Sequence, residues 1–317
     1  MPDEVEIAVE GCGICGTDIA ITAGTGDEVP AEPHPVTGCC APMTLGHEIV
    51  GKVVAPDGEL FGRRVAVWPY VPSRGEASLA PTTEAGHLGM TAHGGMADRL
   101  VARAACCVPI ADSVPLAAAV LCEPLAVVLR AFRLSGAAVA GRRVAIIGGG
   151  SIGLCALDVA WHRGAAEVVV VDPQEAARRA AVDAGASRAV VPGEARGIEA
   201  AVVVEASGAA SGINTAMYAC SPRGVVIVIG DHHRPEPLDV ETLLIRELRI
   251  CGSAGHDFEL DFTPAVLAVG RGELGARPRP VRRVSLEQAP DIVLGRSELR
   301  TGAKVVVVPT LTSEENR

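Results

Sequence analysis

The stretch "RRVAIIGGGSIGLCALDVAWHRGAAEVVVVD", residues 142–172, decides the fold of this chain. It opens on an apolar run, passes through a glycine-rich turn and continues with apolar residues at helical spacing, before a second apolar run ends in Asp172. A strand, a tight turn and a helix in this order are typical of a parallel sheet with crossover helices. Three glycines of the turn have the spacing G-x-G-x-x-G, namely Gly148, Gly150 and Gly153.

The glycine-rich turn predicts a dinucleotide site. Gly148 allows the tight turn, Gly150 lets a pyrophosphate approach the backbone, and Gly153 permits close packing of the helix on the strand. Ser151 and Ile152 open the helix, whose N-terminal N–H groups attract a phosphate. We therefore expect these five residues to bind the cofactor.

Asp172 lies at the end of the second apolar run, 19 residues after Gly153. An acidic side chain there accepts hydrogen bonds from ribose hydroxyls and repels a 2′-phosphate, which favours NAD as the cofactor. Arg178 is expected to contribute to the same site, and with Arg179 it leaves NADP open as an alternative. In the simpler interpretation, Asp172 is only a turn residue at the end of a strand.

Six apolar runs between residues 143 and 252 alternate with Ala-rich helical segments. Such a series predicts a doubly wound parallel sheet, the Rossmann form of an α/β fold. Residues 19–120 are rich in Gly and Pro with short apolar runs, which predicts a separate β-rich domain. The six runs are "RRVAIIG", "EVVVVD", "RAVV", "AAVVVEA", "GVVIVIG" and "LRICGS".

Composition limits the class of partner. Of the 317 residues 49% are hydrophobic and only 3% aromatic, which suits a core of Val, Leu, Ile and Ala. The net charge of −10 and the absence of a basic cluster argue against nucleic acid and membrane surfaces, so a small molecule is expected. Ten scattered cysteines and an acidic N-terminal segment, unlike a signal peptide, predict reduced thiols and a cytoplasmic location.

Four residues could form a metal site: Cys15, His47, Glu48 and Glu123. A catalytic zinc takes three protein ligands from N, S and O donors and keeps one open position. The spacings are long, so they prove nothing by themselves. A lone Cys is usually a small buried hydrophobe, and Glu123 could merely charge the start of a helix. The neighbouring Cys122 is a further candidate, because a thiolate is a softer ligand.

The order of four motifs resembles the zinc-dependent medium-chain alcohol dehydrogenases over nearly the whole chain. The motifs are "GCGICGTD" (11–18), "TLGHEIVG" (44–51), "LCEPLAVVLRA" (121–131) and "GGGSIGL" (148–154). Within that family, residues 32–48 and 86–101 resemble the (R,R)-butanediol and sorbitol dehydrogenase branch.

The resemblance implies a GroES-like catalytic domain of residues 1–123 and 267–317, discontinuous around a Rossmann NAD-binding domain of residues 124–266. It implies that Cys15 and His47 bind zinc, and that Glu48 and Glu123 do so directly or through water. Thr17 would carry a proton away from the substrate. Family habit further suggests a homodimer or homotetramer, formed near "LRICGS".

The resemblance also implies an activity, hydride transfer between a secondary alcohol or vicinal diol and NAD, with 2,3-butanediol and acetoin as the model pair. A dehydrogenase of polyols, cyclitols or amino sugars is the alternative within the same chemistry. A nucleotide-binding protein that has lost turnover is the alternative from another class.

Three departures from the family pattern bear on these expectations. Many relatives have a relay histidine where this chain has Ala20, so the relay beyond Thr17 must use water or ribose hydroxyls. Residues 66–100 contain no cysteine, so we expect one catalytic zinc and no structural zinc. Relatives usually begin with one or two further strands, so we expect either an uncovered sheet edge beside the strand that starts at Glu4 or a true start that lies before Met1.

Several histidines outside the motifs are candidates for weaker roles. His34, His87 and His93 lie in expected loops near the cleft, where they could touch substrate or simply be solvated. His232 and His233 follow the fifth run of the sheet, where a cofactor contact is possible.

Overall fold

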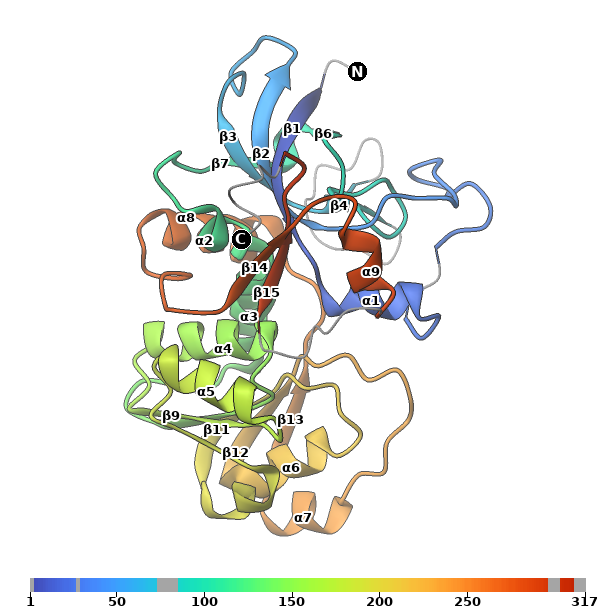
Figure 1. The fold of residues 1–317 in the computed structure, drawn as a ribbon. Helices are drawn as coiled ribbons and strands as arrows, with labels where there is room; N and C mark the ends of the chain where they lie inside the picture. The colour runs from blue at the N-terminus through green and yellow to red at the C-terminus, as the bar shows by residue number, and fades with distance from the viewer. Residues whose placement is uncertain (1–2, 27–28, 73–84, 296–302, 311–317) are drawn as a thin grey trace.

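A computed structural model describes residues 3–26, 29–72, 85–295 and 303–310 of the chain. The elements form two main sheets, one in the upper half and one in the lower half of Figure 1. No helix within these ranges is long and apolar enough to cross a membrane.

The upper sheet has seven strands and combines both ends of the chain. The path runs β14-β15-β1-β2-β3-β7, and β6 pairs with β1 beside it. Every second residue at the start of β1 is buried, which is the pattern of a strand with one face on a core. The strands are β1 (Glu4–Gly13), β2 (Glu48–Ala55), β3 (Arg64–Val67), β6 (Arg99–Arg103), β7 (Cys107–Pro109), β14 (Val281–Val284) and β15 (Lys304–Val307).

The expectation of an uncovered edge at the first strand is wrong. β2 pairs along one side of β1. The other side is shared, because β6 pairs with Glu4 to Ala8 and β15 pairs with Cys12 and Gly13. The end of β1 therefore lies directly against the C-terminal strand that carries Lys304.

The lower sheet confirms the six predicted strands of the doubly wound fold. All pairs are parallel, and the order is β10-β9-β8-β11-β12-β13. The crossover from one side of β8 to the other places the carboxyl ends of β8 and β11 beside a crevice, the usual position of a bound dinucleotide. The strands are β8 (Arg143–Ile147), β9 (Glu167–Val171), β10 (Arg188–Val190), β11 (Ala200–Glu205), β12 (Cys220–Val228) and β13 (Arg249–Gly252).

Helices cover both faces of the lower sheet. Alternate residues of β8 point to opposite sides, with Val144 and Ile146 in one hydrophobic cluster and Ala145 and Ile147 in another. The first cluster includes residues of α3, α4, α5 and α8, and the second includes residues of α6. These helices are α3 (Cys122–Ser135), α4 (Ser151–His162), α5 (Glu175–Asp183), α6 (Gly212–Ala219) and α8 (Thr263–Gly270).

Helix α3 lies between the two sheets (Figure 1) and contacts β2 of the upper sheet and β12 and β13 of the lower one. It starts one residue before Glu123 and ends at Ser135, and the next residue, Gly136, has a φ of 60°, the left-handed conformation that commonly stops a helix. Its N-terminus therefore places Glu123 at the junction of the two sheets.

The remaining elements are short. They comprise a separate two-stranded antiparallel sheet and short helical segments. They are α1 (Gly16–Thr22), β4 (Tyr70–Val71), β5 (Gly86–His87), η1 (Ala104–Cys106), α2 (Leu116–Ala119), η2 (Pro192–Gly197), α7 (Val240–Ile245), the π-helical turn η3 (Phe258–Phe262) and α9 (Ala289–Val293).

Candidate active site

Cys15 lies in the turn between β1 and α1, and Asp18 holds this turn in place. One carboxylate oxygen of Asp18 accepts a hydrogen bond from the Cys15 N–H (2.8 Å), and the other accepts from the Gly46 N–H (3.0 Å). Asp18 has no exposed surface. Because Gly46 precedes His47, one buried carboxylate joins the loops of both candidate ligands. The Cys15 thiol lies 3.6 Å from the Thr17 hydroxyl.

His47 is buried among acidic groups. Its Nδ1 lies 3.8 Å from Asp18 Oδ1. Burial by itself lowers the pKa of His47, but Cys15, which also hydrogen-bonds to it, together with Asp18 and Glu123 raises that pKa well above the usual value. The arrangement therefore stabilises positive charge beside the Cys15 thiol.

Glu48 forms a buried ion pair with Lys304 of β15. Both side chains are at most 2% exposed, and Lys304 Nζ also donates to the Ile14 carbonyl at 3.0 Å. Burial by itself lowers the pKa of Lys304, yet Glu48 and then Cys15 raise it overall, so the ammonium stays charged. A Cβ added at Gly13 would collide with Glu48 Oε2, so this glycine makes room for the pair.

Glu123 is paired with His256, which follows β13. The His256 Nε2 lies 3.0 Å from Glu123 Oε1, and His256 has no exposed surface. Burial raises the pKa of Glu123, but the hydrogen bond and charge of His256, followed by the charge of His47, lower it overall to about 2. Glu123 is therefore an ionised carboxylate at neutral pH.

A group of aromatic rings contacts His256, the partner of this carboxylate. The chain has two Trp, two Tyr and four Phe, and four of these eight lie in one connected group with three histidines. The Tyr70 ring makes edge contacts with His87 (4.8 Å between centroids) and with His256 (5.5 Å). The group comprises Trp68, Tyr70, Phe258, Phe262, His47, His87 and His256.

His87 is a neutral member of this group. Its Nδ1 donates to the Leu88 carbonyl at 2.8 Å, since a carbonyl can only accept. Burial, followed by the charge of His47, lowers the pKa of His87 to about 3. Of the three loop histidines, His87 thus belongs to the site. The other two bind backbone N–H groups, His34 at Val36 and Thr37 and His93 at Thr44.

No group of three or more His, Cys, Asp or Glu side chains within the described ranges is arranged to hold a metal ion. Glu48 is engaged by Lys304, and Glu123 by His256. The donor types nevertheless fit zinc, because thiolate, imidazole and carboxylate are its usual ligands. A zinc ion would also supply the positive charge that the acidic groups around His47 favour.

Cys122 is not part of this set. It lies in the hydrophobic core at 1% exposure, and burial raises the pKa of its thiol to about 12. Ala20, at the position of the relay histidine, is also buried, and its Cβ packs against Gly26. The small side chain at position 20 therefore matches the tight turn that follows α1.

The glycine-rich turn joins β8 to α4. Gly148 has a φ of 100°, and a Cβ at Gly153 would collide with the Gly148 carbonyl oxygen. Gly150 precedes the first helical residue, and a Cβ there would meet nothing within 4 Å. The Ser151 hydroxyl is buried and has no partner among the described residues. A pyrophosphate at this helix N-terminus would satisfy it together with the first N–H groups, among them that of Ile152.

Asp172 uses both oxygens of its carboxylate to order this loop. They accept from the N–H of Gly149 and of Gln174, each at 2.8 Å. Arg178 donates to the backbone carbonyls of Asp172 and Pro173, also at 2.8 Å. Asp172 is thus more than an isolated turn residue, since it links the glycine-rich turn to the end of β9.

A second histidine–glutamate pair lies at the carboxyl edge of the lower sheet. Glu205 ends β11 without exposed surface and accepts from the Ser207 N–H at 2.9 Å. His232 Nε2 lies 3.0 Å from its other oxygen, and His232 Nδ1 is buried without a partner among the described residues. This pair joins the ends of β11 and β12 on the cofactor side.

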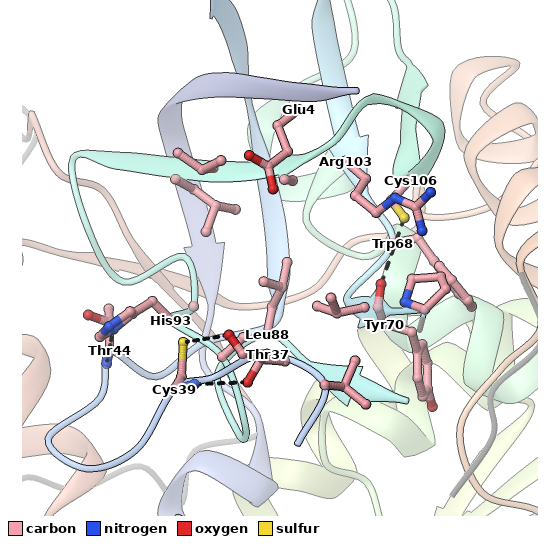
Figure 2. Close-up of a pocket in the computed structure, with 18 of the residues that line it drawn as sticks. Glu4, Thr37, Cys39, Thr44, Trp68, Tyr70, Leu88, His93, Arg103 and Cys106 are labelled. Carbon is pink, nitrogen blue, oxygen red and sulfur yellow. Dashed lines mark hydrogen bonds between the residues drawn. The ribbon is translucent and has the colours of Figure 1, made fainter. Parts of the chain in front are cut away.

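Trp68 and Tyr70 also line a pocket with a volume of about 840 Å³, and Figure 2 shows these two side chains among its lining residues. Thr37, Cys39 and His93 line it from the loops. None of the candidate metal or cofactor residues lines this pocket.

Several residues of the site have no local signal in the sequence. His256 lies 133 positions from Glu123, and Lys304 lies in an ordinary apolar strand run. The chain has only two lysines, Lys52 and Lys304. A single lysine in a strand run that is otherwise all valine was the one sequence signal that Lys304 has a buried acidic partner.

Two family models match the chain. "Alcohol dehydrogenase GroES-like domain" matches residues 1–112, and "Zinc-binding dehydrogenase" matches residues 151–269.

Individual relatives match over most of their length. The (R,R)-butanediol dehydrogenase of Neisseria gonorrhoeae is 27% identical over 98% of this chain and 94% of its own. The 2-dehydro-3-deoxy-L-galactonate 5-dehydrogenase of Pseudoalteromonas atlantica is 30% identical over 87% of this chain and 82% of its own. A solved structure of a zinc-binding dehydrogenase from Sinorhizobium meliloti 1021, bound to NADP, has a TM-score of 0.83 at 28% identity and covers 97% of this chain and 92% of its own.

Proposed function

Because this chain belongs to the zinc-type medium-chain alcohol dehydrogenase family, we propose that it transfers hydride between a vicinal diol or related secondary alcohol and NAD. The observation that carries the proposal is the grouping of Cys15 with the buried His47 and Glu123 at the junction of the two sheets. The substrate class, with 2,3-butanediol and acetoin as the model pair, is supported by the butanediol dehydrogenase relative.

We propose the domain division 1–123 with 267–317 against 124–266. Its support is the pairing of the C-terminal strand β15 with β1, while all six strands of the parallel sheet lie between residues 143 and 252.

Cys15, His47 and Glu123 would hold one catalytic zinc, with Glu48 held close by Lys304. When bound, zinc supplies a Lewis acid that lowers the pKa of an alcohol and polarises a ketone. Thr17 then accepts the proton of the substrate hydroxyl and passes it to water or a ribose hydroxyl. The support for this role is the distance of 3.6 Å between its hydroxyl and the Cys15 thiol.

The cofactor would lie over the glycine-rich turn. Gly148, Gly150, Ser151, Ile152 and Gly153 bind its pyrophosphate, and NAD is favoured by the Asp172 carboxylate beside the ribose. Arg178 lies at the same end, and a relative has been solved with NADP, so the test includes both cofactors.

The test is an assay of butanediol isomers, acetoin and polyols with NAD and NADP, together with elemental analysis for zinc. We expect NAD reduction with a vicinal diol and about one zinc per chain. No reduction with any diol, combined with no bound zinc, would contradict the proposal.

A polyol or sugar-acid dehydrogenase is the second candidate. It is favoured by the relative at 30% identity, whose name gives a deoxy sugar acid as its substrate. A higher kcat/KM for such compounds than for butanediol in the same panel would select it.

We also propose that two copies associate through β13. This strand is the last of its sheet, and exposed edge strands favour pairing. Five exposed apolar side chains lie on it and on the segment of α7, namely Leu238, Val240, Leu244, Ile245 and Ile250. Light scattering should give a dimer or tetramer, and Ile245→Asp should shift it towards monomer while Phe61→Asp, an exposed control, should not. The cytoplasmic location stays a prediction from the sequence.

A further inference from the structure

We propose that His256 is a positioning residue for Glu123 and thereby strengthens zinc binding at the candidate metal site. The inference rests on the proposed function, because it takes Glu123 as a zinc ligand. Its basis is the contact of His256 Nε2 with Glu123 Oε1 at 3.0 Å, between two side chains that are at least nine-tenths buried.

The direction of this hydrogen bond follows from the chemistry of the pair. A carboxylate can only accept, so Nε2 of His256 donates. Glu123 Oε1 is thereby occupied, whereas Glu123 Oε2 has no hydrogen-bond partner among the described residues. One oxygen is held and the other stays free for a cation beside His47.

The imidazole is itself fixed by packing. It stacks on the Phe262 ring (5.5 Å between centroids, 18° between planes) and meets the edge of Tyr70. Because the imidazole has no exposed surface and contacts both rings, we infer that His256 offers its Nε2 in one orientation and reduces the rotamer freedom of Glu123 before any metal binds.

The segment that carries His256 is attached to the same helix that carries Glu123. Asp261 in η3 accepts two hydrogen bonds from the Arg133 guanidinium, both at 2.8 Å, and a third from the Asp257 N–H at 2.9 Å. Arg133 lies ten positions after Glu123 in α3, a rise of about 15 Å. Helix α3 therefore contacts residues 256–262 at two points, through Glu123 at His256 and through Arg133 at Asp261. The second contact helps to hold His256 close to Glu123.

His232 and Glu205 provide a matched control inside the same molecule. Their contact is also 3.0 Å, and in both pairs the histidine Nδ1 is buried without a partner among the described residues. Glu205 lies at the end of β11 and is not a candidate ligand. Loss of this second imidazole removes the same kind of hydrogen bond without touching the metal ligands.

The experiment measures the zinc affinity of the full-length zinc-loaded protein by competition with a chelator, and the visible absorption of the cobalt-substituted protein. His256→Phe keeps a ring on Phe262 but removes the donor, and we expect zinc binding to weaken by about 10- to 100-fold, with an altered cobalt spectrum. His232→Phe should leave both unchanged. His256→Gln places an amide N–H near the position of Nε2 and should restore most of the affinity.

A comparison of His256→Gln with His256→Asn decides the matter if the Phe variant does not fold. Asn is too short to reach Glu123, so it should bind zinc as weakly as expected for Phe, while Gln should not. Equal and undiminished affinities in the Gln and Asn variants would overturn the inference. Glu123→Gln separates the proposed ligand set from the proposed role of His256. If this variant keeps its zinc affinity, Glu123 is not a ligand and the proposed ligand set is wrong. If it binds zinc more weakly while His256→Phe does not, only the role of His256 is wrong.

Discussion

The two halves of the candidate active site are built in opposite ways. The dinucleotide half (Gly148 to Gly153 with Asp172) relies on the backbone, with one left-handed glycine, a helix N-terminus and a single carboxylate that orders the loop. The metal half (Cys15, His47, Glu48 and Glu123 with their partners) relies on buried ionisable side chains. Those partners come from α1, β15 and the segment after β13.

This difference predicts how strongly each half responds to substitution. A site built from the backbone tolerates substitutions that need no change of φ and no additional space for a side chain. A cluster of buried charges does not, because removing one partner leaves the other unpaired in a medium that disfavours charge. The metal half should therefore show the larger effects, and the following changes test this order.

Cys15→Ser should have the largest effect on activity. Loss of the thiolate ligand removes the Lewis acid, and we expect kcat/KM to fall by about a thousandfold or more. NADH affinity, measured by fluorescence titration, should change little, because the dinucleotide half does not contact Cys15. Activity within tenfold of the parent protein would show that zinc is not required.

Lys304→Met should have the largest effect on stability. It removes the cation partner of the buried Glu48 carboxyl, whose pKa burial already raises to about 7, so this carboxyl is expected to take up a proton at neutral pH. Breaking a buried ion pair typically costs about 3–5 kcal/mol of the free energy of unfolding. Lys52, the other lysine, is exposed on β2, so Lys52→Met is the matched control and should be close to neutral. Denaturant unfolding measures both. The double variant with Glu48→Gln should recover part of the loss, and no recovery would argue against the ion pair.

Gly13→Ala should have an intermediate effect. The added Cβ would meet Glu48 Oε2 and Lys304 Cε, so the pair must shift, at a cost of about 1–3 kcal/mol. Gly16→Ala, three positions on, has nothing within 4 Å of the new Cβ and should be tolerated. Thermal unfolding of the two variants distinguishes them, and equal midpoints would contradict the crowding at Gly13.

Asp172→Asn should have the smallest effect of the four. Asn keeps one acceptor but loses the second and the negative charge, so we expect NADH affinity to fall by about tenfold and the preference for NAD over NADP to weaken. Zinc content should not change. Asp183 is exposed at the end of α5, so Asp183→Asn is the control that removes one negative charge without changing the glycine-rich turn. A loss of zinc in Asp172→Asn would break the separation of the two halves.

Much of the dinucleotide half was predictable. The six strands, the turn at Gly148 and the helix from Ser151 lie where their patterns indicate, because strand, turn and helix are contiguous in the chain and obey local rules. The metal half was predictable only in its candidate ligands, and those came from a resemblance. The partners Lys304 and His256 were missed, because nothing within their own neighbourhoods marks what they contact.

The sequence by itself determined the fold class and the glycine-rich turn, since apolar periodicity and glycine spacing act over a few residues. Only the tertiary structure decided which charges meet. The pairing of β15 with β1 brings Lys304 to Glu48, and the position of α3 between the sheets brings Glu123 to His256. The physical reason is that a buried charge needs a partner in space, and the chain supplies that partner from any distance along the sequence.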